Sequence, residues 1–151
     1  MYKQQSGFTL IELVVVIVIL GILAATALPR FISITTDARM AKVRGAAAAL
    51  SSAGSLAHAA QLVAAIQSNV SVTMEGSLVT MANGYPTADS PGIGVAANIQ
   101  SSSTDFSATG SNPYSVASDT GHATCNVTYT AAGVATPPTI SQTNITTANC
   151  S

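Results

Sequence analysis

The chain has 151 residues, a formal net charge of −1, and charged side chains at only 7% of its positions. This length suits one domain, and so few charges leave no general basic surface of the kind that binds nucleic acid. The hydrophobic fraction of 48% and the mean hydropathy of +0.44 are high for a soluble protein. Much of the excess lies in the first 28 residues, so the composition predicts an apolar segment followed by a more polar domain.

The apolar run extends from Phe8 to Leu28, and Glu12 is its only charged residue. At 1.5 Å per residue, a helix of this length can cross about 30 Å of hydrocarbon. The alternative is a cleavable secretory signal, with Lys3 before the run and a cleavage site at 25–27. The run is longer than the apolar core of such signals, and a carboxylate near its start is unusual there. We therefore expect a membrane-spanning helix.

The stretch GFTLIELVVVIVILGILAATALP, from Gly7 to Pro29, closely resembles the N-terminal signature of type IV pilins and pseudopilins. In these proteins a short polar leader ends in glycine and precedes an apolar helix. The resemblance implies that residues 1–7 are removed by a membrane-embedded prepilin peptidase, which cuts after Gly7. It also implies that the new amino terminus, Phe8, is N-methylated.

Glu12 lies inside the apolar run, where a carboxylate is disfavoured by about 2.5–3.5 kcal/mol unless it has a partner. In the family pattern, the glutamate of an incoming subunit neutralises the terminal amine of the preceding subunit and fixes the axial register. The resemblance therefore implies an assembly role for Glu12 and Phe8. The two residues are also four apart on one helix, so we expect an intrahelical pair in the single membrane subunit.

Gly21 and Pro29 weaken the helix between them, because glycine has a low helix propensity and proline removes a hydrogen bond. In type IV pilins the matching segment can lose helicity in the filament; the alternative is a simple kink. We expect residues 8–28 to form the transmembrane and filament-core helix. Residues 29–68 are expected to be an amphipathic helix continuing into the globular domain, helical to about Ile66. Its apolar stripe comprises Val43, Ala46, Leu50, Ala53, Ala57, Ala60 and Ala64.

From residue 69 onward the apolar pattern changes to alternation, which is typical of strands. A hairpin is predicted around Glu75-Gly76, and NGYP and SPG mark turns. Later β-branched runs lie at 114–117, 124–131 and 139–146. The predicted fold is therefore α+β: a long N-terminal helix packed on a small antiparallel sheet of about four strands in residues 69–151. This architecture is the type IV pilin fold that the resemblance implies.

Cys125 and Cys150 are the two cysteines of the chain and predict one disulfide in an oxidising compartment. The positive-inside rule predicts that the C-terminal part lies on the cytoplasmic side, whereas the cysteine pair predicts that it lies outside. We adopt the prediction from the cysteine pair. The NGYP motif, this pair and CNVTYTAAG resemble the mannose-sensitive haemagglutinin group of type IVa pilins. That resemblance implies an exposed, disulfide-closed C-terminal loop.

We identify no catalytic residue, metal site or cofactor site in the sequence. His58 and His122 have no carboxylate or cysteine at a ligand spacing, so ordinary surface or partly packed roles are expected. The basic cluster at Arg39, Lys42 and Arg44 is expected to be solvated, or to contact lipid headgroups or a neighbouring subunit.

These features predict a structural pilin, not an enzyme, whose partners are other copies of the chain, a prepilin peptidase and methyltransferase, and the inner-membrane assembly machinery. The subunit is expected in the bacterial inner membrane before assembly and in an extracellular pilus afterwards. There it would serve attachment to host or environmental surfaces, adhesion and motility. The alternatives are a type II secretion pseudopilin and a minor pilin for DNA uptake, and the sparse charge does not favour nucleic acid.

Overall fold

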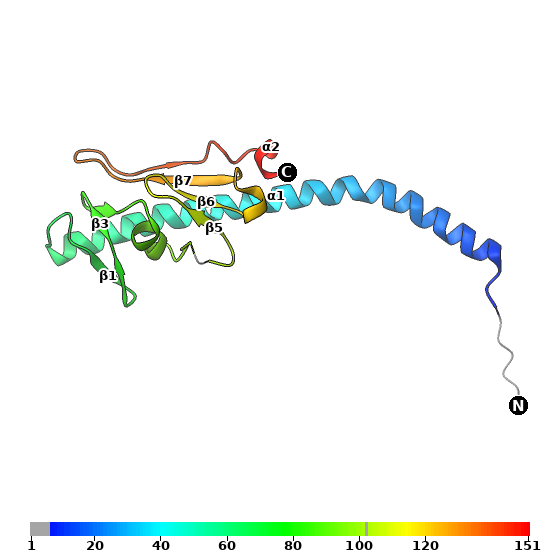
Figure 1. Ribbon diagram of the computed structural model, residues 1–151, viewed down its shortest axis with the longest axis horizontal. Coiled ribbons are helices and arrows are strands. Elements are labelled where there is room, and N and C mark those ends of the chain that lie inside the picture. The colour runs from blue at the N-terminus through cyan, green and yellow to red at the C-terminus, as the bar shows by residue number, and fades with distance from the viewer. Residues whose placement is uncertain (1–6, 102) are drawn as a thin grey trace, which may run out of the picture. The chain divides into compact units, whose positions relative to one another are not determined.

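The computed structural model describes residues 7–101 and 103–151, except for the side chain of Ile32. The predicted leader at 1–7 therefore lies outside the described residues apart from Gly7. The chain divides into two compact units, Met1–Thr35 and Thr36–Ser151. Helix α1, Leu10–Ala64, supplies residues to both units (Figure 1).

The first unit contains the apolar part of α1. Its large hydrophobic side chains are exposed; Leu10 is 80% exposed and Leu23 is 58% exposed. By length and composition α1 can cross a membrane, since its most apolar window has a mean hydropathy of 2.8. The helix continues through Gly21 and Pro29. The loss of helicity expected for this interval in a filament stays a prediction.

The second unit begins with a part of α1 that buries one face. The predicted stripe is buried at Val43, Ala46, Leu50, Ala53 and Ala57, as is the adjacent Ala47. These small side chains let strands approach the helix closely, and in Figure 1 strands β5, β6 and β7 run beside this part of α1.

The helix ends earlier than predicted. It stops at Ala64, and Ala65 has a φ of 51°, in the left-handed region that ends helices. The buried Gln61 side chain donates to the carbonyl oxygens of Gln67 (2.8 Å) and Val70 (3.3 Å). These bonds fix the path of the chain after α1. The prediction of a helix over 29–68 was therefore wrong for residues 65–68.

Two short hairpins follow α1, and both match the turn signals of the sequence. Strands β1, Val72–Met74, and β2, Ser77–Val79, pair through the turn at Glu75-Gly76, as predicted. Strands β3, Met81–Ala82, and β4, Tyr85–Pro86, pair through Asn83-Gly84. All four turn residues have φ between 48° and 86°. A two-residue hairpin turn of type I′ requires positive φ at both of its central residues.

A single turn of π-helix, η1 (Ser90–Gly94), follows at the predicted SPG turn. The Asp89 carboxylate accepts from the Gly92 amide at 2.8 Å and from the Thr87 hydroxyl at 2.6 Å. A Cβ at Gly92 would overlap Thr87, and one at Gly94 would lie 2.8 Å from the Tyr114 hydroxyl. Glycine is therefore required where η1 meets its neighbours.

The main sheet is antiparallel with the order β5-β6-β7-β8. Its strands are β5 (Ser107–Thr109), β6 (Tyr114–Ala117), β7 (Asn126–Thr130) and β8 (Thr139–Ser141). A 3-10 turn, η2 (Thr120–His122), joins β6 to β7. The four-stranded sheet and its packing on the helix confirm the predicted fold class.

Three details differ from the predicted sheet. The two hairpins form sheets of their own. Strand β5 was not predicted, because Ser107–Thr109 carries little β-branched character. The strand predicted at 139–146 ends at Ser141, and a short helix, α2 (Thr147–Cys150), follows with Thr146 as its cap. Thr146 caps the start of this helix instead of extending a strand.

The core of the second unit contains two buried tyrosines whose hydroxyls are satisfied. Tyr114 donates to the Ile99 carbonyl at 2.6 Å, and Tyr129 donates to the Pro86 carbonyl at 3.0 Å. Burial raises the pKa of both phenols, so both stay protonated and remain donors at neutral pH. The two bonds join the sheet to the segments around β4 and η1.

Leu50 tests whether the buried face of α1 holds the second unit together. We expect Leu50→Ala to lower the free energy of unfolding by about 2–5 kcal/mol, because it removes a fully buried side chain and leaves a cavity. Leu56, on the same helix but 59% exposed, is the matched control, and Leu56→Ala should change stability by about 0.5 kcal/mol or less. Urea titration of the full chain in detergent measures both; equal losses would contradict this packing.

Candidate functional site

The amino end of α1 carries the predicted assembly residues. The Glu12 carboxylate accepts a hydrogen bond from the Thr9 amide at 2.9 Å and one from the Thr9 hydroxyl at 2.7 Å. In return, the Glu12 amide donates to the Thr9 hydroxyl oxygen at 3.3 Å. Because α1 begins at Leu10, Thr9 is the N-cap residue and Glu12 is the third helical residue, which defines a capping box.

This capping role was missed at the sequence level, although TLIE contains the Thr-x-x-Glu signature that predicts it. In the uncleaved chain the nitrogen of Phe8 is a peptide nitrogen, so it offers no ammonium group to Glu12. The carboxylate is instead held by Thr9. Pairing of Glu12 with an amine at Phe8 stays a prediction for the processed chain.

The surroundings of Glu12 are apolar and open. A shallow hollow of about 360 Å³ is lined by Phe8, Ile11, Glu12, Val15 and Val16. Phe8 is 89% exposed. A Cβ at Gly7 would meet nothing within 4 Å, so packing among the residues that the structure describes gives no reason for glycine there. The expected reason, access of a peptidase to the Gly7-Phe8 bond, stays a prediction.

A second group of polar contacts ties α1 to the disulfide region. Arg39 donates to the Cys150 carbonyl at 3.1 Å and forms an ion pair with Asp119 at 3.5 Å. The Lys42 ammonium donates to the carbonyls of Ser118 (2.7 Å) and Asp105. These contacts correct the expectation for the basic cluster: two of its three side chains bind the chain's own backbone.

His122 is partly packed, as expected, but it also has a carboxylate partner that was not predicted. Its Nδ1 lies 2.7 Å from the Asp119 carboxylate, which also accepts from the His122 amide at 2.9 Å. The hydrogen bond from the His122 ring is the main reason why the pKa of Asp119 lies below its ordinary value of 3.8. Asp119, which was not predicted as a partner of His122, lies three residues before it and is the N-cap residue of η2.

His58 is partly packed, as expected. Its ring stacks on Tyr85 with centroids 4.1 Å apart, and its Nδ1 lies 2.6 Å from the Gly84 carbonyl oxygen. Since a carbonyl only accepts, the Nδ1 of His58 carries the proton. Within the described ranges no group of three or more His, Cys, Asp or Glu side chains could hold a metal ion.

Cys125 and Cys150 form a disulfide, which confirms the predicted pairing. Both residues are fully buried, and their α-carbons are 4.8 Å apart. The Thr124 hydroxyl donates to the Asn149 carbonyl at 3.2 Å, which adds a hydrogen bond beside the covalent link. The short helix α2 is thereby held to the strand that contains Val127 and Tyr129.

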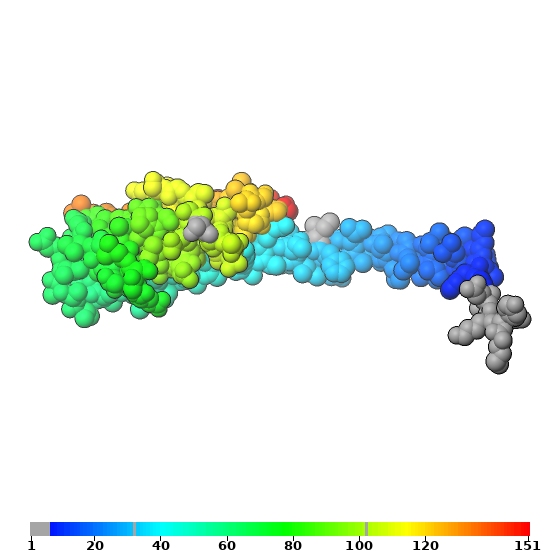
Figure 2. Space-filling model, turned by 60° about the horizontal axis from the view of Figure 1, so that its bottom comes forward, coloured from blue at the N-terminus to red at the C-terminus, as the bar shows by residue number. Residues whose placement is uncertain are grey.

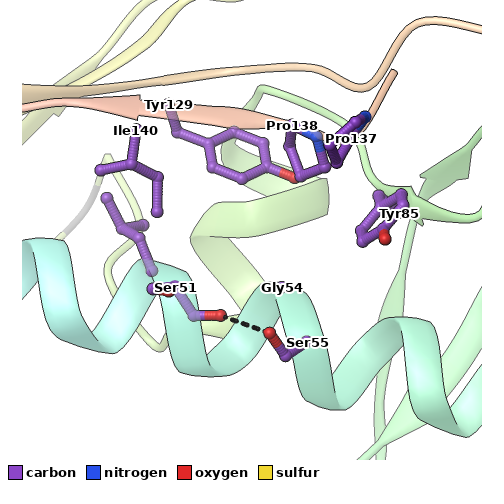
Figure 3. A pocket seen from close by; sticks show the side chains of 9 residues that line it. Ser51, Gly54, Ser55, Tyr85, Tyr129, Pro137, Pro138 and Ile140 are labelled. Carbon is purple, nitrogen blue, oxygen red and sulfur yellow. Dashed lines mark hydrogen bonds between the residues drawn. The ribbon is translucent and has the colours of Figure 1, made fainter. Parts of the chain in front are cut away.

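A cleft of about 190 Å³ opens between α1 and the connection from β7 to β8 (Figure 3). Ser51, Gly54 and Ser55 of α1 form one wall, and Figure 3 shows Pro137 and Pro138 opposite them with Tyr85 at one end. The side chains that line it carry no charge. The cleft therefore lacks the paired acids or activated nucleophile of a hydrolytic site.

Comparison with known protein families identifies the prokaryotic N-terminal methylation motif at residues 2–28. The chain is 54% identical to the type IV narrow pilus major component PilA5 of Thermus thermophilus over 54 residues, which are 36% of this chain and 47% of that protein. It is 49% identical to the type II secretion system core protein G of Pseudomonas aeruginosa over 51 residues, 34% of this chain and 36% of that protein.

A fimbrial protein of Pseudomonas aeruginosa is 43% identical over 51 residues, 34% of this chain and 33% of that protein. The chain thus aligns with less than half the length of each of these relatives. No solved structure matches it.

The motif and these similarities show that residues 2–28 carry the N-terminal methylation motif of prepilins and that the first third of the chain is similar to a pilus component and to a type II secretion protein. With the apolar first part of α1, they fit a membrane-anchored subunit that becomes part of a pilus. The mannose-sensitive haemagglutinin subtype is not confirmed.

Asp119 gives a pH-dependent test of the contacts around Arg39. Because the folded-state pKa of Asp119 is lowered, its carboxylate stabilises the fold above the unfolded value and loses this effect as pH falls through the folded value. We expect Asp119→Asn to destabilise the chain by about 1 kcal/mol or less at neutral pH, since the pair is partly exposed.

The difference between Asp119→Asn and the parent chain should begin to shrink as pH falls below about 3.8, the ordinary pKa of Asp119, and should vanish only below its lower folded-state pKa. Urea midpoints of the full chain, measured across this range, give the answer. Asp37→Asn replaces an exposed carboxylate on α1 and is the control. A difference for Asp119→Asn that persists in acid would exclude an electrostatic origin.

Proposed function

We propose that the chain is a structural pilin subunit that polymerises into an extracellular type IV pilus used for attachment to surfaces, adhesion and motility. The observation that carries this proposal is the N-terminal methylation motif at the start of a 55-residue helix whose first part is apolar and exposed. The similarity to a pilus component and to a fimbrial protein supports it.

The physical basis of the proposal is the exposed apolar surface of residues 10–28. Burying apolar area stabilises a state by about 25 cal/mol per Å², so this surface favours lipid before assembly and other apolar helices afterwards. A bacterial inner membrane supplies the first environment, and the core of a filament supplies the second. In the first unit the described side chains of residues 10–26 are all exposed.

Processing supplies the second partner of Glu12. A prepilin peptidase would hydrolyse the Gly7-Phe8 bond, leaving a carboxylate on Gly7 and an amine on Phe8, which a methyltransferase would then methylate. The amine and Glu12 form an ion pair whose unpaired members are costly in a low-dielectric core. A subunit that enters out of register leaves both charges unpaired, so the pair selects the correct axial position. The inner-membrane assembly machinery would add subunits in this register.

The second candidate is a pseudopilin of a type II secretion system, favoured by the 49% identity to core protein G. The two candidates differ in where the polymer is found. Fibres sheared from the cell surface that contain this chain support the pilus, and their absence from cells that process the chain supports the secretion system.

Mass spectrometry of the amino terminus tests the processing step. We expect the mature chain to begin at methylated Phe8, and Gly7→Val to retain residues 1–7 because a branched side chain obstructs the scissile bond. Ser6→Ala keeps the glycine and is the matched control, which should be cut normally. A mature chain that begins at Leu28 would instead identify a secretory signal.

Glu12 is tested with two substitutions that separate its capping role from its charge. Glu12→Ala removes both, whereas Glu12→Gln keeps a capping side chain but removes the charge. We expect both variants to insert in the membrane and to reduce sheared fibres at least about tenfold, because leaving one member of a buried pair unpaired costs about 3–5 kcal/mol.

Asp37→Ala, another acid on α1, is the control and should assemble normally. Normal fibres from Glu12→Gln together with none from Glu12→Ala would show that capping, and not the ion pair, is what assembly needs.

A further inference from the structure

Arg30 is a cation whose side chain has no partner among the described residues. It follows Pro29 at the end of the apolar run, and it is the only charged residue between Glu12 and Asp37. Its side chain is exposed, and it forms no ion pair within the part of the chain that the structure describes. The helix positions three and four residues away, where a carboxylate could pair with it, are uncharged: Thr26, Ala27, Ser33 and Ile34.

Two cations of the second unit differ from Arg30 in this respect. Arg39 donates to the Cys150 carbonyl, and Lys42 donates to the Ser118 carbonyl, so each has a structural partner within the chain. Arg30 belongs to the first unit, whose described residues are almost all in α1. Figure 2 shows this part of α1, in blue, with no other described segment against the face in view. A partner for Arg30 must therefore come from another molecule.

The position of Arg30 along α1 matches one boundary of a bilayer core. From Leu10, where α1 begins, to Arg30 the helix rises by about 30 Å, which is the thickness of the hydrocarbon layer. The exposed apolar surface does not end at Arg30, because Phe31 is 66% exposed and Ile34 is 60% exposed. The charge of Arg30, and not the end of the apolar surface, therefore marks the limit of the segment that can enter hydrocarbon.

A guanidinium at this level meets the phosphates of phospholipids. Arginine binds a phosphate group through two parallel N–H···O bonds, and its charge does not depend on pH in the physiological range. Its aliphatic stem can lie along the apolar surface of a helix while the guanidinium reaches the headgroups. The carboxylate of Asp37 lies seven residues further along α1, a rise of about 10 Å, so it does not supply the anion.

We propose that Arg30 binds the phosphate group of a phospholipid at the carboxyl-terminal end of the span, and that this contact sets the depth of α1 in the membrane. Phe31 and Ile34 then lie at the level of the headgroups. The ligand is a lipid because Arg30 directly continues the exposed apolar surface that fits a membrane anchor. This inference rests on the membrane-anchored state of the subunit and holds equally for a pilus subunit and for a secretion pseudopilin.

Solid-state NMR of the full chain in vesicles of phosphatidylethanolamine and phosphatidylglycerol tests the contact. The arginines of the chain are Arg30, Arg39 and Arg44, and their guanidinium carbons can be labelled together. Distance-dependent dephasing by the lipid phosphorus reports a guanidinium that is held beside a phosphate. We expect a dephased arginine signal in the parent chain and its loss in Arg30→Lys, which removes the label and keeps the charge.

Arg44→Lys is the matched control, because Arg44 is also an exposed cation on α1, and this variant should keep the dephased signal. No dephasing in the parent chain, or its loss in Arg44→Lys and not in Arg30→Lys, would overturn the contact. Vesicles of a neutral galactolipid with added inorganic phosphate separate the two sources of phosphate. The dephasing should be absent there, and a signal that persists would identify a free phosphate ion and overturn the lipid assignment.

The depth of α1 gives an independent readout. A nitroxide on Ser33→Cys reports its depth through collisions with oxygen and with a polar nickel complex, and the native cysteines do not react because they form a buried disulfide. In this background Arg30→Gln should move the nitroxide toward the bilayer centre by about 3 Å or more, the rise of two helical residues. Without the charge, Phe31 and Ile34 favour hydrocarbon.

Arg30→Lys keeps a cation and should stay close to the parent depth, and Arg44→Gln should leave the depth unchanged. An equal depth in the parent chain and in Arg30→Gln would overturn the role of Arg30 in setting the depth of α1. Both measurements use the unassembled subunit. Absence of fibres from cells would therefore overturn the proposed pilus and leave this inference standing, whereas a parent chain without the phosphate contact would overturn this inference alone.

Discussion

The uncovered apolar surface of the first part of α1 is the constraint on which the other features depend. A helix that is hydrophobic on all sides must be buried in lipid or among other helices, since water offers it no favourable environment. Here the side chains of residues 10–26 are exposed, and none of the described residues covers them. The apolar surroundings that this segment needs must therefore be supplied by other molecules. Because lipid and a protein core are both apolar, the same side chains suit either of them.

The same helix meets a different requirement after Thr36. Its buried face there consists mainly of alanine with Val43 and Leu50, and the sheet packs on it closely. Two cations on the helix bind backbone carbonyls at Ser118 and Cys150, near the two ends of the disulfide region. Apolar packing thus stabilises the middle of the second unit, Arg39 attaches the end of the disulfide-closed segment to α1, and Lys42 attaches the residues that precede this segment.

The sequence allowed the fold to be predicted wherever a local pattern was sufficient. The stripe at Val43 and Leu50 follows from helical periodicity, and the turns at Glu75-Gly76 and Asn83-Gly84 follow from the φ values that glycine and asparagine tolerate. The β5 strand and the contact of Arg39 with Asp119 depend on residues distant in the sequence. No local pattern encodes them, because tertiary packing decides which carbonyls and carboxylates come within reach of α1.

Glu12 has a partner in the chain as described, and the proposed processing would offer it a second one. Before cleavage, two hydrogen bonds from Thr9 satisfy it, and a capping interaction of this kind stabilises a helix by about 1 kcal/mol. A pair with a terminal amine in an apolar core is far more sensitive to loss of its partner, at about 3–5 kcal/mol. In the proposed filament the terminal amine would be a further partner of this carboxylate. Under the proposed processing that amine would arise only when Gly7 is removed, so the uncleaved chain has its carboxylate bound by Thr9 and lacks the group proposed to pair with a neighbour.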